Sequence, residues 1–225
     1  MKKHLRPILL VAMKDIQLEL RSREVVIASL VFAVMIALIF NFALDVTSET
    51  VHLLAPGILW VSFAFSGVLV MNRTFVMEKD QGSLEGLLLC PVSRDSLYFG
   101  KMLALFLFMT VVEAVLLPVF AVAFGFTAFS FTLILVVLLA TLGFATIGTL
   151  FSSIAVNTRS HEIMLPVLFF PVVSPVIIGA VEASTGTISG SMQMIGVGHW
   201  IHLMIVFDVV FLVLCSWAFG LVMEE

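Results

Sequence analysis

Residues 77–101 read MEKDQGSLEGLLLCPVSRDSLYFGK, a stretch with charges of both signs that lies between two long apolar runs. Its centre is a short amphipathic segment. Leu84, Leu87 and Leu88 are spaced three and four residues apart, which places them on one edge of a helix. Ser83 is a suitable N-cap, and Pro91 disfavours helix in the residue before it. The stretch therefore predicts a helix over 83–90, which is more than a plain connector between two membrane spans needs.

A second helix is predicted to begin just after this proline. Ser93 is suited to cap a helix that continues into the next apolar run. Arg94 and Lys101 are then expected at the membrane surface, and Glu78 and Arg94 flank the short helix with charge.

The rest of the chain is too apolar for a water-soluble domain. It has 225 residues, of which 61% are hydrophobic and 12% charged, whereas soluble domains are about half apolar and a quarter charged. A helix crosses the ~30 Å hydrocarbon core with about 20 apolar residues. The apolar runs predict an all-α integral membrane protein, one domain over 1–225 with six spans at about 25–44, 53–72, 102–124, 131–155, 163–181 and 201–223. The short turn GFTAFS predicts that spans three and four form a hairpin.

The N-terminal residues predict a helix that lies along the membrane, over about 5–21. Its apolar residues recur on one face and its polar residues lie off that face. The apolar set is Leu5, Leu9, Ala12, Ile16 and Leu20; the polar set is Arg6, Lys14, Gln17 and Arg21. The alternative is an unstructured basic leader.

The Lys and Arg residues predict the orientation. All 11 fall in the N-terminal segment, the loop after span two or the loop after span four. Because short basic loops stay in the cytoplasm, both termini and the 77–101 loop are predicted to be cytoplasmic.

No motif for catalysis is present. A P-loop, H-E-x-x-H and C-x-x-C-H are all missing. The chain is therefore expected not to be an enzyme by itself, and no resident metal or cofactor is predicted.

Two carboxyl groups fall inside predicted spans, Glu113 and Asp208. Each costs about 2.5–3.5 kcal/mol at mid-bilayer. They predict either a polar cavity, a proton step or contact with a polar cargo, or else a pair of buried helix contacts or simple protonation.

Three further patterns concern the helices themselves. Pro166, Pro171 and Pro175 predict that span five is not a straight helix, and the hydroxyl residues after it predict an irregular outer element (Ser184, Thr185, Thr187 and Ser189). A small-residue face in span four predicts close helix packing, either within the chain or at a dimer seam (Thr141, Ala145 and Thr149). His199 and His202, one turn apart, are either contacts to a metal or haem iron or ordinary membrane-boundary residues.

The segment NRTFVMEKDQGSLEGLLLCPVSRDSLYFGKML resembles the loop of ABC-2 exporter permeases, in which Glu-Gly-(Ser/Thr)-Leu-Glu precedes Leu-Leu and Pro. More narrowly, LAPGILWVSFAFSGVLVMNR followed by GTLFSSIAVNTRSHEIMLPVLFFPVVSPVIIGAVEAS resembles the haem exporter protein B (CcmB) family, in that order and over nearly the entire chain.

The resemblance implies a permease subunit of type V exporter-like fold, which works in cytochrome c maturation in the bacterial inner membrane. The helix after Gly82 would be a coupling helix that binds a separate ABC ATPase, through Gly82, Ser83, Leu84, Glu85, Leu87, Leu88 and Pro91. The helix over 5–21 would be the elbow helix. Two permeases would join two ATPases, a haem-handling membrane subunit and a haem chaperone. The ATPase would hydrolyse ATP and haem would be the possible cargo. No nucleic-acid partner is implied. The alternatives are an ABC-2 exporter of a drug, lipid or polysaccharide, and a proton-coupled secondary transporter that uses Glu113 and Asp208.

Overall fold

A computed structural model describes residues 2–22, 24–43, 51–80, 93–125, 130–155, 161–188 and 194–222. Within these ranges the regular structure is entirely helical. The helices are α1 (Lys2–Ser22), α2 (Glu24–Ala43), α3 (Val51–Asp80), α5 (Arg94–Phe124), α6 (Phe131–Ala155), α7 (His161–Ile188) and α8 (Met194–Val222).

Five of these helices, α3, α5, α6, α7 and α8, each contain a stretch long and apolar enough to cross a membrane. The α2 helix adds a shorter apolar stretch, Ile27–Ala43. The predicted all-α membrane fold is confirmed, while a count of six spans stays a prediction. Several helices extend past the predicted spans: α3 runs to Asp80, α5 begins at Arg94 and α8 begins at Met194.

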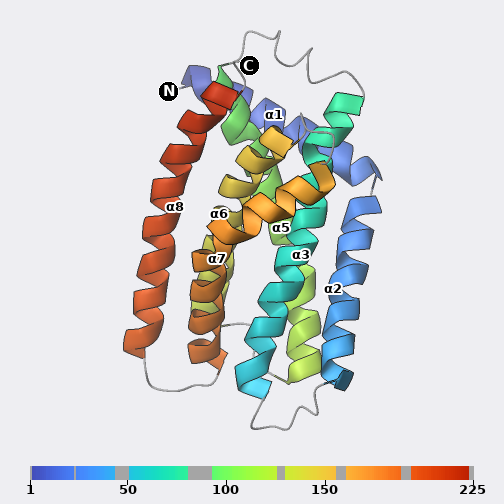
Figure 1. Ribbon diagram of the computed structural model, residues 1–225, viewed down its shortest axis with the longest axis vertical. Helices are drawn as coiled ribbons and strands as arrows, with labels where there is room; N and C mark the ends of the chain where they lie inside the picture. The colour runs from blue at the N-terminus through green and yellow to red at the C-terminus, as the bar shows by residue number, and fades with distance from the viewer. Residues whose placement is uncertain are drawn as a thin grey trace.

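The long helices form an elongated bundle, and α1 lies across one end of it (Figure 1). The α8 helix ends at that same end (Figure 1). A helix is thus present where the sequence predicts one, while its place along the membrane stays a prediction. The residues it buries are not its whole apolar stripe. Val11 and Ala12 are buried, whereas Leu9 is 58% exposed.

The α5–α6 pair shows how local sequence ends a helix. Gly125 has φ 67°, a left-handed conformation that suits glycine, and its N–H donates to the Ala121 carbonyl. The two helices then pack against each other, so the predicted hairpin of spans three and four is confirmed.

The α6 helix forms the centre of the bundle. Phe144 packs against Phe63 of α3 and Phe169 of α7, with ring centroids 5.1 Å and 5.3 Å apart. Its small-residue face is buried inside the chain, as predicted (Thr141, Ala145 and Thr149). Small side chains allow helices to approach closely. Such packing matters in a membrane because no hydrophobic force drives one helix against another in lipid.

The α7 helix is bent, as its prolines predict, and Figure 1 shows the bend near its middle. Pro175 has no N–H to donate to the carbonyl of Pro171, four residues earlier. The Ser174 hydroxyl donates to that carbonyl instead, at 2.9 Å. The break in the backbone pattern is therefore satisfied inside the helix.

The predicted irregular element after span five is wrong for the residues described there. The helix continues to Ile188. The Thr185 and Thr187 hydroxyls donate to the carbonyls of Val181 and Ala183, at 2.8 Å and 2.7 Å, so these polar side chains are satisfied within a helix. Ser184 accepts a hydrogen bond from the Trp60 indole at 3.0 Å. Ser189 lies outside the described residues.

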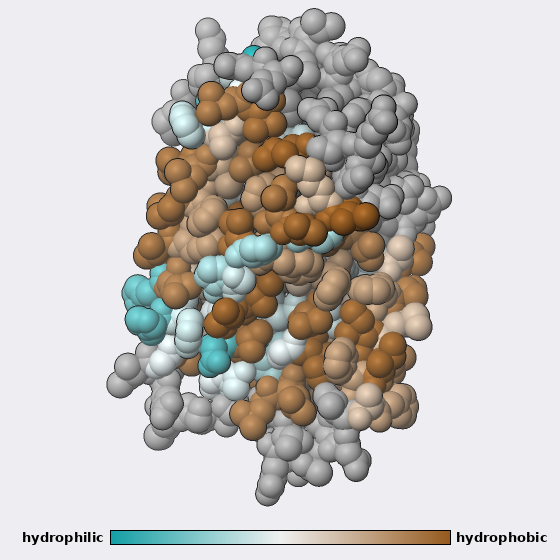
Figure 2. Space-filling model, in the orientation of Figure 1, coloured by the Kyte–Doolittle hydropathy of each residue, from teal (hydrophilic) through white to brown (hydrophobic). Residues whose placement is uncertain are grey.

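The surface of the bundle is mostly apolar, as a lipid-facing surface requires. Figure 2 shows hydrophobic colours over most of one face, with hydrophilic ones around the bend of α7 and at the lower ends of α7 and α8. The outward residues of α8 include Val206, Val209, Val213 and Trp217, all more than half exposed.

Replacing Gly100 by alanine is expected to loosen α1 from α5. The added Cβ would lie 2.7 Å from the Val11 Cβ and 3.0 Å from the Ile8 carbonyl oxygen, and a backbone atom cannot rotate aside. Overpacking typically costs about 1–3 kcal/mol, so the melting temperature of the purified protein in detergent should fall. The control is Gly57→Ala, whose Cβ would meet nothing within 4 Å. Equal melting of the two variants would contradict the claim.

Candidate functional site

The predicted coupling helix falls in a stretch, residues 81–92, that lies outside the described residues. Gly82, Ser83, Leu84, Glu85, Leu87, Leu88 and Pro91 are therefore not placed, and the side chain of Glu78 is not described either. The structure does describe the two helices that hold this stretch. The α3 helix ends at Asp80, and α5 begins at Arg94.

The start of α5 is capped as the sequence predicts. Ser93 is extended, with φ −65° and ψ 145°, and its hydroxyl oxygen accepts a hydrogen bond from the Ser96 N–H at 3.3 Å. This contact satisfies one of the first N–H groups of the helix, which have no partner within it. The point where the chain re-enters the bundle is thus defined by local sequence.

Arg94 connects the first turn of α5 to the end of α8. Its guanidinium Nη1 donates to the Gly220 carbonyl at 2.9 Å. Carbonyls in the last turn of a helix lack intrahelical donors, and a cation is favourable there. The side chain is exposed, as expected for a residue at the membrane surface.

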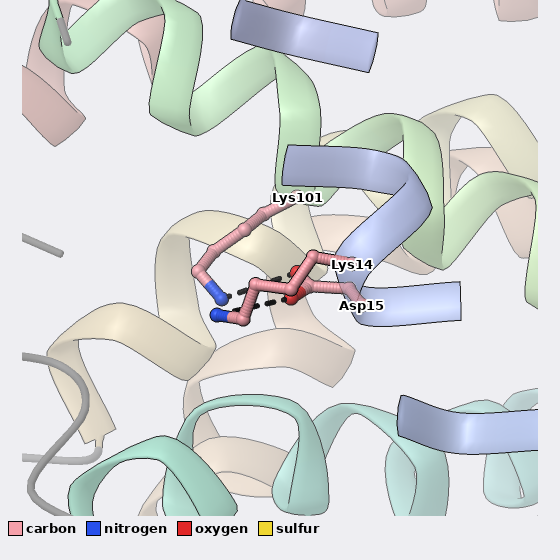
Figure 3. Close-up of polar contacts among 3 residues, drawn as sticks. All are labelled: Lys14, Asp15 and Lys101. Atoms are coloured by element: carbon pink, nitrogen blue, oxygen red, sulfur yellow. Dashed lines mark hydrogen bonds and ion pairs between the residues drawn. The ribbon is translucent and has the colours of Figure 1, made fainter. Parts of the chain in front are cut away.

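Lys101, by contrast, is covered by protein, and its place at the membrane surface stays a prediction. Its side chain is fully buried, and its ammonium lies 3.3 Å from Asp15 Oδ2 of α1. Lys14 Nζ lies 3.6 Å from the other carboxylate oxygen, and Figure 3 shows both ammonium groups directed at Asp15. Because α1 crosses the bundle end over this part of α5, the lysine is covered by protein and needs a charged partner.

Two further contacts hold the same part of α5. Gly100 packs directly under Val11 of α1, and the Tyr98 hydroxyl donates to the Thr146 carbonyl of α6 at 3.0 Å. Between Arg94 and Lys101, α5 is therefore joined to α1, α6 and α8.

Asp15 and Lys101 are functional candidates that the sequence analysis missed. A usable signal was present in α1. Asp15 follows Val11 and Ala12 by four and three residues, so the acid shares the face that packs on the bundle. An acidic residue on a packed face predicts a buried partner.

Glu113 is buried between α5 and α6 and is hydrogen-bonded to Thr141 of α6. It also lines a groove between the two helices. The helix-to-helix contact expected for this residue is present, and the groove beside it has mostly apolar walls, which differs from the polar cavity that was the alternative.

Asp208 is buried on α8 and is not among the residues that line the groove beside Glu113. Neither of its carboxyl oxygens has a hydrogen-bond partner among the described residues. A Cβ on Gly143 of α6 would lie 2.8 Å from Asp208 Oδ1. The carboxyl group thus occupies the space that glycine leaves open, and the two predicted intramembrane acids have different surroundings.

His199 and His202 are exposed on the first turns of α8. The His202 Nδ1 lies 2.7 Å from the Gly198 carbonyl oxygen. Because a carbonyl only accepts, Nδ1 carries the proton, and Nε2 keeps its lone pair in the neutral ring. Within the described ranges no three His, Cys, Asp or Glu residues gather as a metal site.

The comparisons with known proteins identify the family. A family model described as "CcmB protein" matches residues 6–224. The chain belongs to the CcmB family.

Relatives named "Heme exporter protein B" are similar over most of their length. The one from Pseudomonas aeruginosa is 31% identical over 157 residues, which cover 68% of this chain and 70% of the relative. The one from Paracoccus denitrificans is 26% identical over 182 residues, covering 80% and 84%. The one from Haemophilus influenzae is 26% identical over 168 residues, covering 74% and 76%. The family predicted from the loop and the order of blocks is confirmed.

A double-mutant cycle on Asp15 and Lys101 is expected to show strong coupling. Lys101→Met leaves the carboxylate without its buried ammonium, and breaking one partner of a buried ion pair costs about 3–5 kcal/mol. Asp15→Leu combined with Lys101→Met should recover most of that loss, because replacing both charges by apolar groups is often nearly neutral.

The measurement is the melting temperature of each purified variant in the same detergent. Arg94→Met serves as the control, because its contact is exposed and its loss should shift melting little. Additive effects of the two single changes would mean that the ion pair does not hold α1 in place.

Proposed function

We propose that this chain is the transmembrane permease subunit of an ABC transporter complex that acts in haem export or haem delivery during cytochrome c maturation. The observation that carries the proposal is the CcmB match over residues 6–224, supported by the relatives named for haem export. The helical bundle of apolar helices suits a permease.

In this proposal the chain does mechanical work, and a separate ATPase subunit hydrolyses ATP. Residues 83–90 form a coupling helix whose leucines fill a groove on the ATPase, a recognition mode in which an amphipathic helix buries its apolar edge. Glu78 and Arg94 flank it with charge. Closure of the ATPase moves this helix, and the segment of α5 from Arg94 to Lys101 passes the movement to α1, α6 and α8. The contacts that support this route are Arg94–Gly220, Tyr98–Thr146 and Lys101–Asp15.

The proposed complex contains two permeases and two ATPases, together with a haem-handling membrane subunit and a haem chaperone. It lies in the bacterial inner membrane with both termini cytoplasmic. The distribution of Lys and Arg supports this orientation. So does the position of α1 and the end of α8 at the same end of the bundle (Figure 1).

His199 and His202 are the candidates for contact with haem. Both are exposed near the start of α8, on the outer side in the proposed orientation. His202 is the better iron ligand of the two, because its contact with Gly198 leaves Nε2 as the free acceptor.

Deleting the gene is expected to abolish covalent haem in every c-type cytochrome of the cell. The measurement is a haem stain of membrane and periplasmic fractions from cells with the gene, without it and with it restored. Normal haem bands in the deletion strain would refute the haem assignment. They would leave an ABC-2 permease for another cargo.

Leu88→Asp is expected to abolish co-purification of the ATPase while the chain still inserts in the membrane. An ionised side chain on the apolar edge of the coupling helix would be desolvated in the ATPase groove without a partner. Leu88→Met keeps the volume and the apolar character and should bind as wild type. Unchanged co-purification of Leu88→Asp would remove the coupling-helix claim.

A further inference from the structure

A groove of about 210 Å³ lies between α5 and α6, and Glu113 is the one titratable residue among those that line it. The other lining residues are Thr110, Ala114, Leu117, Pro118, Ile134, Val137 and Leu138. Ala114, Pro118, Ile134 and Leu138 are exposed on the surface of the bundle. The groove therefore opens on the side of the helices that meets lipid, and its polar point is a carboxyl group.

Glu113 itself is 5% exposed. A second hollow borders it on the inner side, lined by Leu59, Trp60 and Phe63 among other apolar residues. Glu113 is the one titratable residue in either lining. Among the described residues that line the groove and the hollow, no cation is therefore present to balance an ionised carboxylate.

The Thr141 hydroxyl indicates which form of the carboxyl group is present. Its oxygen lies 2.5 Å from Glu113 Oε2 and 2.7 Å from the Val137 carbonyl oxygen. A hydroxyl has one hydrogen and donates one bond, and the Val137 carbonyl only accepts. A protonated Glu113 gives both contacts a full hydrogen bond, because Glu113 donates to Thr141 and Thr141 donates to Val137, whereas an ionised Glu113 leaves one hydroxyl hydrogen shared between two acceptors.

In that chain of bonds one carboxyl oxygen is used as the donor. The other is a carbonyl-type oxygen, which accepts hydrogen bonds. The site thus combines apolar walls with one acceptor at its floor, the usual composition of a small-molecule site.

We propose that the α5–α6 groove is a binding site, entered from the lipid, for a neutral apolar molecule with one hydroxyl or N–H donor, which the protonated Glu113 carboxyl receives. The groove would bind such a molecule whatever cargo the permease carries. The charge-free walls exclude an ionic ligand, because an ion there would be desolvated without a partner.

Dicyclohexylcarbodiimide is a suitable probe, since it is lipid-soluble and reacts with protonated carboxyl groups. The carboxyl proton moves to a carbodiimide nitrogen and the carboxyl oxygen bonds to the central carbon, so the whole reagent is added and nothing leaves. Purified protein in lipid nanodiscs is treated with the reagent, digested and analysed by mass spectrometry. Labelling of Glu113 is expected to exceed labelling of Asp208 several-fold, because Asp208 is equally buried but does not line the groove.

The donor requirement is tested by competition. Dodecanol should protect Glu113 from the reagent several-fold better than dodecane, which has the same chain and no hydroxyl. Glu113→Gln, checked for folding by size-exclusion chromatography, should remove the labelled peptide. Absence of label on Glu113, equal label on Asp208, or equal protection by the alkane would overturn the proposal.

Discussion

The ion pair between Lys101 and Asp15 is the contact on which the arrangement of the bundle end depends. A fully buried ammonium is costly without a carboxylate beside it, and Asp15 supplies one from α1 at 3.3 Å. The pair joins α1 to α5 at the point where Gly100 lets the two backbones approach closely. Removing Lys101 would leave Asp15 with only the more exposed ammonium of Lys14 beside it, and removing Asp15 would take the carboxylate away from a fully buried ammonium.

This arrangement has a consequence for the permease role. The first turns of α5 follow the 81–92 stretch directly and contact α1, α6 and α8. A movement of α5 alone would therefore break its contacts with these three helices. Packed interfaces of this kind tend to move as units rather than deform continuously.

Elsewhere the bundle satisfies polar groups within its own helices, as a membrane interior requires. Hydroxyls of Thr149, Thr185 and Thr187 donate to carbonyls four residues earlier, and Ser174 serves the carbonyl that Pro175 leaves without a donor. Asp208 departs from this pattern, because its oxygens find no partner among the described residues. Glu113 conforms to it through Thr141, and its groove gives the carboxyl group a route to the lipid.

The sequence by itself determined the helical membrane class, the order of the apolar helices, the Ser93 cap and the bend of α7. These are local properties: hydropathy over a helix length, a hydroxyl before a first turn, and prolines without an N–H. The prediction that polar residues interrupt a helix was wrong after span five. Thr185 and Thr187 favoured an irregular element, but their hydroxyls bond to their own helix.

Only the tertiary structure decided which charges are buried and with whom. Lys101 and Asp15 are 86 residues apart along the chain, and nothing near Lys101 distinguishes a lysine at the lipid surface from one covered by α1. The pairing of Glu113 with Thr141 and the seat of Asp208 on Gly143 depend likewise on which helices are neighbours. Neighbours are set by the packing of the whole bundle. In a membrane protein an apolar side chain can face either lipid or another helix, and its hydropathy does not distinguish the two.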